Sequence, residues 1–112
     1  MKIVFTAKGT TLDSEIDERF GRAEYFVILD EESGDIEVIE NDTSSMEHGA
    51  GLQAVKKIVD SKANVVITGN GAGQKVLDVL KMSDIKFFIG AKNITLKEAY
   101  EKYKNNQLES QF

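Results

Sequence analysis

The chain lacks cysteine, proline and tryptophan and has a single histidine among its 112 residues. Without cysteine it cannot form a disulfide scaffold, a zinc ribbon, a cysteine nucleophile or an iron–sulfur cluster ligated by its own thiolates. The one histidine, His48, excludes a metal site built from several imidazoles. These absences exclude most of the thiol and metal chemistry that a chain can supply by itself.

Positive charge and long apolar runs are also scarce. The 14 lysines and arginines stand against 19 aspartates and glutamates, and the net charge of −5 argues against a nucleic-acid partner because little would neutralise a run of phosphates. No apolar run approaches the roughly 20 residues of a membrane span, and no basic-then-apolar signal pattern opens the chain. We therefore expect a soluble cytoplasmic protein that does not associate with membranes.

What the chain does contain is the composition of an ordinary globular domain, with 41% apolar and 29% charged residues. Its length fits one domain, which we place at residues 1–105. The remaining residues, 106–112, form a polar tail that we expect to fray. No repeat, low-complexity tract or linker divides the chain.

Five β-rich runs alternate with helical patterns along the chain. The strands are predicted at residues 2–6, 25–29, 36–40, 64–68 and 85–89. A short glycine-containing turn joins the second run to the third, which is typical of a hairpin. Helical apolar stripes begin near residues 49, 74 and 95. The order β-β-β-α-β-α-β-α predicts an α/β fold with a mixed five-stranded sheet covered by helices.

The expected strand directions bring several loops to one edge of the sheet. If the first strand points up, the second points down, and the third, fourth and fifth point up because crossover helices connect parallel strands. Open α/β sheets bind their ligands at the carboxyl ends of the strands. The loops expected at this rim cover residues 8–9, 20–22, 41–51, 69–73 and 90–92.

One of these rim loops is rich in glycine, with Asn70 between Gly69 and Gly71 and a third glycine at position 73. It lies between a strand and a helix, where backbone N–H groups and the helix dipole attract an anion. Its spacing fits neither a dinucleotide fingerprint nor a phosphate-binding P-loop. The glycines therefore either contact an anionic ligand or allow a tight turn into the helix, and the sequence leaves both readings open.

A second rim segment, residues 48–51, opens the first long helix. The helix dipole disfavours an imidazolium at this place, so His48 should be neutral and able to ligate a metal. Gly49 and Gly51 would let a bulky ligand approach the backbone closely. The alternative is that His48 is a solvent-exposed residue at the start of the helix.

A third rim segment, Phe20, Gly21 and Arg22, precedes the second strand. We expect Phe20 to have a structural role. Arg22 would present its guanidinium either to an oxyanion of a ligand or to one of the protein's own carboxylates.

The acidic residues do not form a catalytic set. The first strand has no aspartate of the kind that holds metals in a ribonuclease H-type site. The chain also has no thiol, no histidine–carboxylate motif and no serine in a nucleophile elbow. We therefore expect a binding protein and not an enzyme.

Four of these segments in this order are similar to a known family. They are residues 19–23 before a Tyr-Phe strand, Asn41 after the hairpin, residues 48–51 at a helix start, and residues 66–69 before the glycine turn. Together they resemble the dinitrogenase iron–molybdenum cofactor biosynthesis family, which includes NifX-type proteins and the C-terminal domain of NifB-type proteins. The resemblance covers about residues 1–108.

The resemblance implies a ribonuclease H-like fold without nuclease chemistry. It further implies a carrier that holds an iron–sulfur precursor or an iron–molybdenum type cofactor transiently and exchanges it with a donor or acceptor protein. His48 would contact the cluster as the candidate metal ligand. Its anionic surface would meet Arg22 and the rim positions Gly21, Gly49, Gly51, Gly69, Asn70 and Gly71.

Two other functions fit the same residues. The rim could belong to a metal-free domain that senses a small anion or a nucleotide through the glycine turn at residues 69–73 and Lys75. It could also be a contact surface for another protein.

Overall fold

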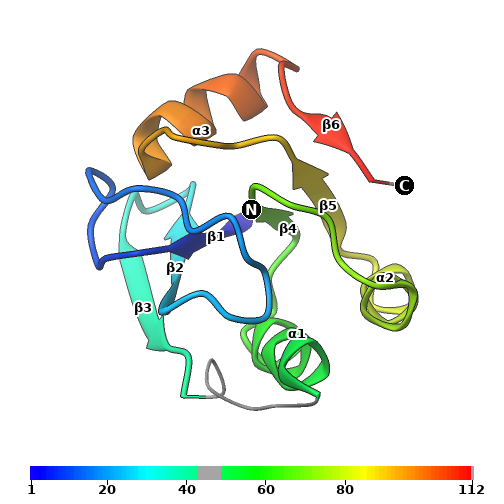
Figure 1. The fold of residues 1–112 in the computed structure, drawn as a ribbon. Coiled ribbons are helices and arrows are strands. Elements are labelled where there is room, and N and C mark those ends of the chain that lie inside the picture. Colours follow the sequence, from blue (N-terminus) through cyan, green and yellow to red (C-terminus); the bar gives the residue numbers. More distant parts are fainter. Residues whose placement is uncertain (43–48, 112) are drawn as a thin grey trace.

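A computed structural model describes residues 1–42 and 49–111, and one mixed sheet forms its centre. The strands lie in the order β3-β2-β1-β4-β5-β6 (Figure 1). They are β1 (Lys2–Ala7), β2 (Tyr25–Asp30), β3 (Ile36–Glu40), β4 (Val65–Ile67), β5 (Lys86–Ile89) and β6 (Glu109–Ser110). The α/β class and the mixed sheet are confirmed, but the described chain forms six strands and not the five that we expected.

The strand directions agree with the prediction. β1 runs parallel to β4, and β4 runs parallel to β5. β2 is antiparallel to both of its neighbours, β1 and β3. The carboxyl ends of β1, β3, β4 and β5 therefore lie at the same edge of the sheet.

The sixth strand has no signature in the apolar pattern. β6 lies in the polar segment that we expected to fray, and it pairs antiparallel with β5. Both of its side chains are exposed, so the strand has no apolar alternation. Its pairing depends on backbone N–H and C=O groups, which every residue carries whatever its side chain. Beside it, Leu108 packs on the apolar cluster under the last helix.

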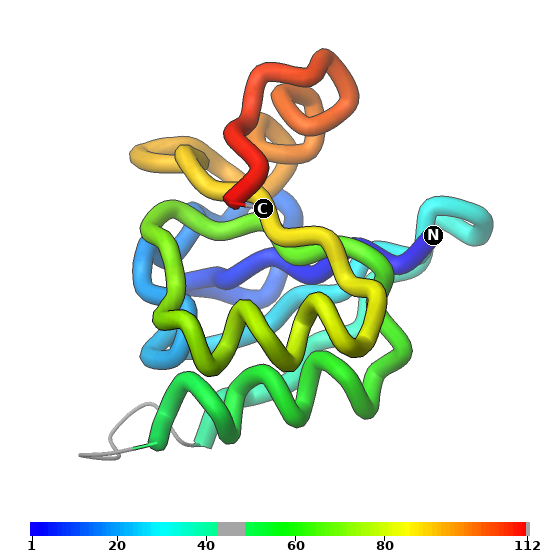
Figure 2. Tube along the Cα trace, turned by 90° about the vertical axis from the view of Figure 1, so that its right-hand side faces the viewer, coloured from blue at the N-terminus to red at the C-terminus, as the bar shows by residue number. Residues whose placement is uncertain are grey.

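Three helices cover the two faces of the sheet. α1 (Ala50–Asp60) and α2 (Gln74–Met82) lie side by side on one face, and α3 (Leu96–Lys104) lies on the other (Figure 1). Figure 2 shows that α1 and α2 run the same way and begin at the same edge of the molecule. No helix in the described ranges is long and apolar enough to cross a membrane.

The side chains of β1 pack against the helices on both faces of the sheet. Val4 faces the apolar cluster of α1 and α2, while its neighbours Ile3 and Phe5 face the cluster of α3. All three side chains are fully buried. A strand covered on both faces needs apolar residues at consecutive positions, which is the run that the sequence shows.

The long connection from β1 to β2 is tied to the sheet edge. Ile16 forms an isolated bridge with Ala7, and Glu15 forms one with Thr95 just before α3. The Ile16 side chain is buried in the cluster of α3. The next two residues, Asp17 and Glu18, lie at the carboxyl ends of β1 and β4, where they contact Thr6 and Gly69.

Candidate functional site

A cleft of about 430 Å³ opens where α1 and α2 begin, at the carboxyl edge of the sheet. Three loops line it, at residues 19–22, 49–51 and 70–73, and Val76 adds an apolar contact from α2. The structure thus brings together three of the rim segments that the strand directions predict. The other two expected rim loops that the structure fully describes, residues 8–9 and 90–92, do not line this cleft.

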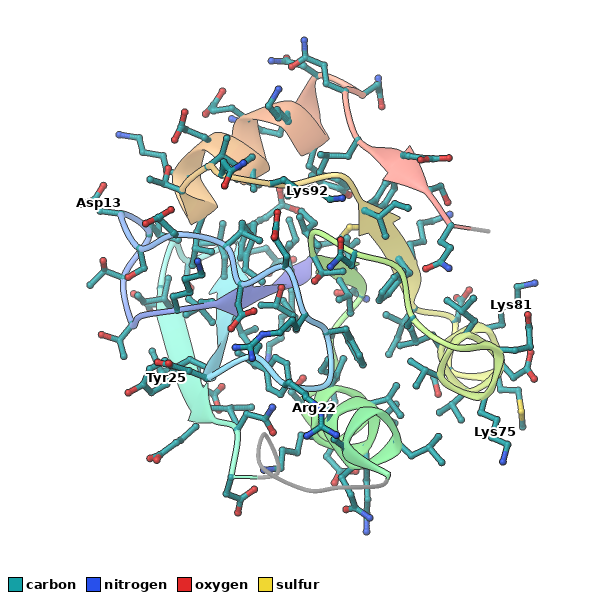
Figure 3. The ribbon with its side chains drawn as sticks, in the orientation of Figure 1. Asp13, Arg22, Tyr25, Lys75, Lys81 and Lys92 are labelled. Carbon is teal, nitrogen blue, oxygen red and sulfur yellow. The ribbon has the colours of Figure 1, made fainter. Side chains whose placement is uncertain are left out.

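The candidate residues fall into three groups. Six of them line the cleft: Gly21, Arg22, Gly49, Gly51, Asn70 and Gly71. Gly69 lies at the base of the turn, where it packs against Glu18. His48 lies outside the described residues. Figure 3 shows Arg22 at the end of α1 where that helix begins.

Gly21 packs against the first turn of α1. A Cβ atom added at Gly21 would lie 2.8 Å from the backbone nitrogen of Gly51 and 2.9 Å from its Cα. Real Cβ atoms do not approach backbone atoms this closely, so only glycine fits without a shift of the helix. The close approach sets the position of Arg22, the next residue, relative to α1.

Asn41 holds the loop at residues 19–22 in place through hydrogen bonds. Its side-chain Nδ2 donates hydrogen bonds to the carbonyl oxygens of Gly21 (3.1 Å) and Ala23 (2.8 Å). Its backbone N–H donates to the carbonyl oxygen of Glu24 at 3.0 Å. Asn41 is only 3% exposed. Its position after the hairpin contributes to the family resemblance, but nothing in the sequence pattern shows that it holds the cleft loop.

Arg19 is a cleft residue that the sequence analysis missed. Its Nε and Nη2 donate to the two carboxylate oxygens of Asp17 at 3.0 and 2.9 Å, and its backbone N–H donates to Oδ1 at 3.1 Å. Burial raises the pKa of the Asp17 carboxyl, but the hydrogen bonds and the charge of Arg19 outweigh burial and hold that pKa below its ordinary value. Because two hydrogen bonds hold the planar guanidinium of Arg19, its orientation is fixed.

Asp17 is itself anchored to the sheet. Its carbonyl oxygen accepts a hydrogen bond from the Thr6 hydroxyl at 2.6 Å, and that hydroxyl is also bonded to the Thr68 hydroxyl at 2.7 Å. Its backbone N–H donates to the carbonyl oxygen of Thr6 at 2.9 Å. The ends of β1 and β4 thereby fix the carboxylate that orients Arg19.

We expect Asp17→Asn to lower the free energy of unfolding by about 1–2 kcal/mol at pH 7, a value reduced because Arg19 is exposed to solvent. Since folding lowers the pKa of Asp17, its contribution is complete above the unfolded pKa of about 3.9 and is lost as the pH falls through the lowered pKa. Urea unfolding of both proteins between pH 7 and pH 2 measures this. The exposed Asp13, changed to asparagine, is the control. A difference that stays constant down to the lowest pH would contradict the prediction.

The glycine turn between β4 and α2 is held by the connection 8–24. The Asn70 N–H donates to the carbonyl oxygen of Glu18 at 2.8 Å. A Cβ at Gly69 would lie 2.8 Å from the Cα of Glu18. At Gly69, close packing therefore accounts for the glycine, which favours the tight-turn reading at that position.

The remaining cleft glycines differ in what requires them. Gly49 has φ of 76°, a left-handed conformation that disfavours other residues. At Gly51, a Cβ would lie 3.2 Å from a methyl group of Val76. Gly73 has φ of −70°, which any residue adopts, and a Cβ there would meet nothing within 4 Å. Nothing in the packing of the described residues requires glycine at position 73.

The two helices that begin at the cleft leave their N-termini uncompensated by their own side chains. The residues before their first turns are Gly49 and Gly73, which have no side chain to accept a hydrogen bond, and neither first turn contains an acidic residue. α3, which begins elsewhere, has a complete capping box between Thr95 and Glu98. Helix N-termini carry partial positive charge and unpaired N–H donors.

The two charged side chains among the described lining residues of the cleft are both positive. Arg19 and Arg22 line it, and none of the lining residues within the described ranges carries a carboxylate. The described residues also contain no group of three histidine, cysteine or acidic side chains that could hold a metal ion. The cleft can therefore bind an anion through N–H donors and guanidinium groups.

The chain and its fold have known relatives. A family model described as dinitrogenase iron–molybdenum cofactor matches residues 1–106. The apo form of the orange protein from Desulfovibrio gigas is 32% identical, with a TM-score of 0.90 over 97% of this chain and 91% of that one. A putative NifB protein from Thermotoga is also 32% identical, with a TM-score of 0.83 and the same coverage, 97% and 91%.

A third structure, PH0822, shares the fold at 20% identity, with a TM-score of 0.75 over 100% of this chain and 97% of that one. None of the curated proteins matches the chain. The family model covers nearly the whole sequence and agrees with the resemblance carried by the cleft loops. The chain belongs to the dinitrogenase iron–molybdenum cofactor family.

Proposed function

We propose that the cleft binds an anionic cofactor of the metal–sulfur class, or a precursor of it, and that the protein carries this group without transforming it. The observation that carries the proposal is the meeting of two uncapped helix N-termini with Arg19 and Arg22 around a cleft whose described lining residues carry no carboxylate. Such a site stabilises negative charge over a whole surface and not at one point.

Gly73 supports the proposal independently. Serine, threonine, aspartate or asparagine would cap α2 better, and the packing does not require glycine. A glycine at the mouth of the cleft leaves the N–H groups of the first turn open to a bulky ligand. Ligand binding by the glycine turn is therefore supported by Gly73, whereas close packing explains Gly69.

The proposal assigns a role to each candidate residue. Arg22 and Arg19 contact the anionic surface, and the backbone at residues 49–51 and at Gly71 and Gly73 supplies N–H donors, because the N–H groups of Asn70 and Ala72 are already bonded within the protein. His48 is the candidate metal ligand of the chain, and only its neutral imidazole can serve, so its contribution should fall as the pH drops through the pKa of an unperturbed histidine, about 6.5. With so few protein ligands, the group must arrive already assembled from a donor protein.

The family supports the metal–sulfur class, since its name refers to the iron–molybdenum cofactor and the orange protein is described in an apo form. The ribonuclease H-like fold implied by the resemblance belongs to the same proposal. The β2–β3 hairpin beside the parallel strands β1, β4 and β5 supports it. We place this carrier in the cytoplasm.

An anaerobic titration tests the proposal. The probe is an iron–sulfide species prepared from ferrous iron and sulfide, followed by visible absorbance, with the metal-free anion pyrophosphate as the second probe. We expect Arg22→Gln to weaken iron–sulfide binding about 10-fold or more, because it removes a charge-assisted contact. Lys75→Gln is the control, since Lys75 is exposed, extends from α2 into solvent (Figure 3) and does not line the cleft.

Each outcome separates the functions. Binding of iron–sulfide that depends on Arg22 and not on Lys75 supports the carrier. Binding of pyrophosphate alone would favour a sensor of small metal-free anions. Equal effects of Arg22→Gln and Lys75→Gln would show that only the general surface charge matters and would contradict a site in the cleft.

A further inference from the structure

One side chain that follows β6, that of Gln111, contacts the glycine turn that lines the cleft. After β6, the Gln111 N–H continues the strand pairing by donating to the carbonyl oxygen of Phe87 at 3.0 Å. The Gln111 side chain turns to the glycine turn instead. Its Oε1 accepts from the Ala72 N–H at 3.1 Å, and its Nε2 donates to the Ala72 carbonyl oxygen at 3.3 Å.

This two-point contact uses a property of the primary amide. A glutamine side chain carries a donor and an acceptor side by side, as a peptide group does, so it can pair with both backbone groups of one residue. Glutamate would accept from the N–H but could not donate to the carbonyl. Methionine of similar length would do neither.

Gly71 is shaped to receive that amide. A Cβ at Gly71 would lie 2.8 Å from Nε2 and 3.0 Å from Oε1 of Gln111. The absence of a side chain at Gly71 therefore makes room for the Gln111 amide, which bonds to Ala72, 39 residues away in the sequence. This contact accounts for Gly71, which the sequence alone assigns either to ligand binding or to a tight turn.

We infer that Gln111 is a positioning residue for the cleft, which holds the β4–α2 turn in the conformation that presents the N–H groups of Gly71 and Gly73 to an anion. Gly71, Ala72 and Gly73 line the cleft on one side of this turn, and Gln111 binds it from the other. The inference rests on the proposed function for its consequence, because a fixed turn matters only if the turn binds a ligand. The contact itself can be measured without any ligand.

The first measurement is hydrogen exchange of the Ala72 amide in the ligand-free protein, by NMR. We expect Gln111→Met to speed this exchange about 10-fold, since the N–H loses its acceptor. Gln107→Met is the matched control, because Gln107 is exposed in the same segment. Equal exchange of the Ala72 amide in wild type and Gln111→Met would overturn the inference, whatever the protein binds.

The second measurement is a double-mutant cycle of iron–sulfide affinity with Gly71→Ala and Gln111→Ala. Each single change should weaken binding about 3–10-fold, because either one releases the turn. Together they should weaken binding no more than Gln111→Ala alone, since the added methyl group then meets no amide. Losses that simply multiply would overturn the coupling. If wild type binds no iron–sulfide, the proposed function fails, and the exchange measurement still decides the role of Gln111.

Discussion

Phe20→Ala is expected to lower the free energy of unfolding by about 3–5 kcal/mol, the range for removing a buried aromatic side chain. Phe20 is 4% exposed although it belongs to a polar loop. Its ring lies 5.5 Å from the ring of Phe87 and 6.3 Å from that of Phe26, centre to centre. The residue that forms a wall of the cleft is thus also part of the core beneath α1 and α2.

Urea unfolding followed by circular dichroism measures this effect. Met82→Ala is the control, because Met82 is 87% exposed and its replacement should change stability by about 0.5 kcal/mol or less. A loss below about 1 kcal/mol for Phe20→Ala would show that the loop does not depend on the core, contrary to its packing.

Gly21→Ala should lower the free energy of unfolding by about 3 kcal/mol, at the upper end of the range for overpacking. The new methyl group would meet the backbone of Gly51, which cannot turn aside as a side chain can. Either the loop or the start of α1 must shift, so iron–sulfide affinity should fall as well.

The matched control is Gly73→Ala, also a glycine of the cleft. Its added Cβ meets nothing within 4 Å, so the only expected loss is that of placing alanine at the N-cap of α2, about 1 kcal/mol or less. Chemical denaturation of both variants makes the comparison. Equal stability of Gly21→Ala and Gly73→Ala would contradict the close approach of the loop to α1.

The backbone of this site could be predicted from the sequence because apolar patterns encode strand order and direction. The parallel run of β1, β4 and β5 follows from the alternation of strands and helices, and it brings the loops 19–22, 49–51 and 70–73 together. The loop at residues 8–9 directly follows the carboxyl end of β1 at the same edge of the sheet, but it does not line the cleft. The residues that follow it are paired with the segment before α3, through the bridge between Glu15 and Thr95.

The contacts that refine the site could not be predicted. Asn41 and Gln111 act through hydrogen bonds from their side chains to backbone groups 18 and 39 residues away, and such bonds follow no period along a sequence. Arg19 pairs with Asp17, only two residues away, but no apolar pattern marks such a pair either. The glycines of the sequence indicate where the rim lies, but they do not show whether a ligand, close packing or the backbone conformation requires each of them. Gly90 illustrates this, since its φ of 98° accounts for it without any ligand.

Amide NMR of the wild-type protein during anaerobic titration with the iron–sulfide species tests the central claim most directly. The account predicts that the shifted amides cluster at residues 19–22, 49–51 and 70–73, the three loops that line the cleft. Amides of α3, which begins away from the cleft and caps itself, should not move. Shifts scattered over α3 and the β2–β3 hairpin, or no shifts at saturating probe, would contradict a binding site for this class of cofactor in the cleft.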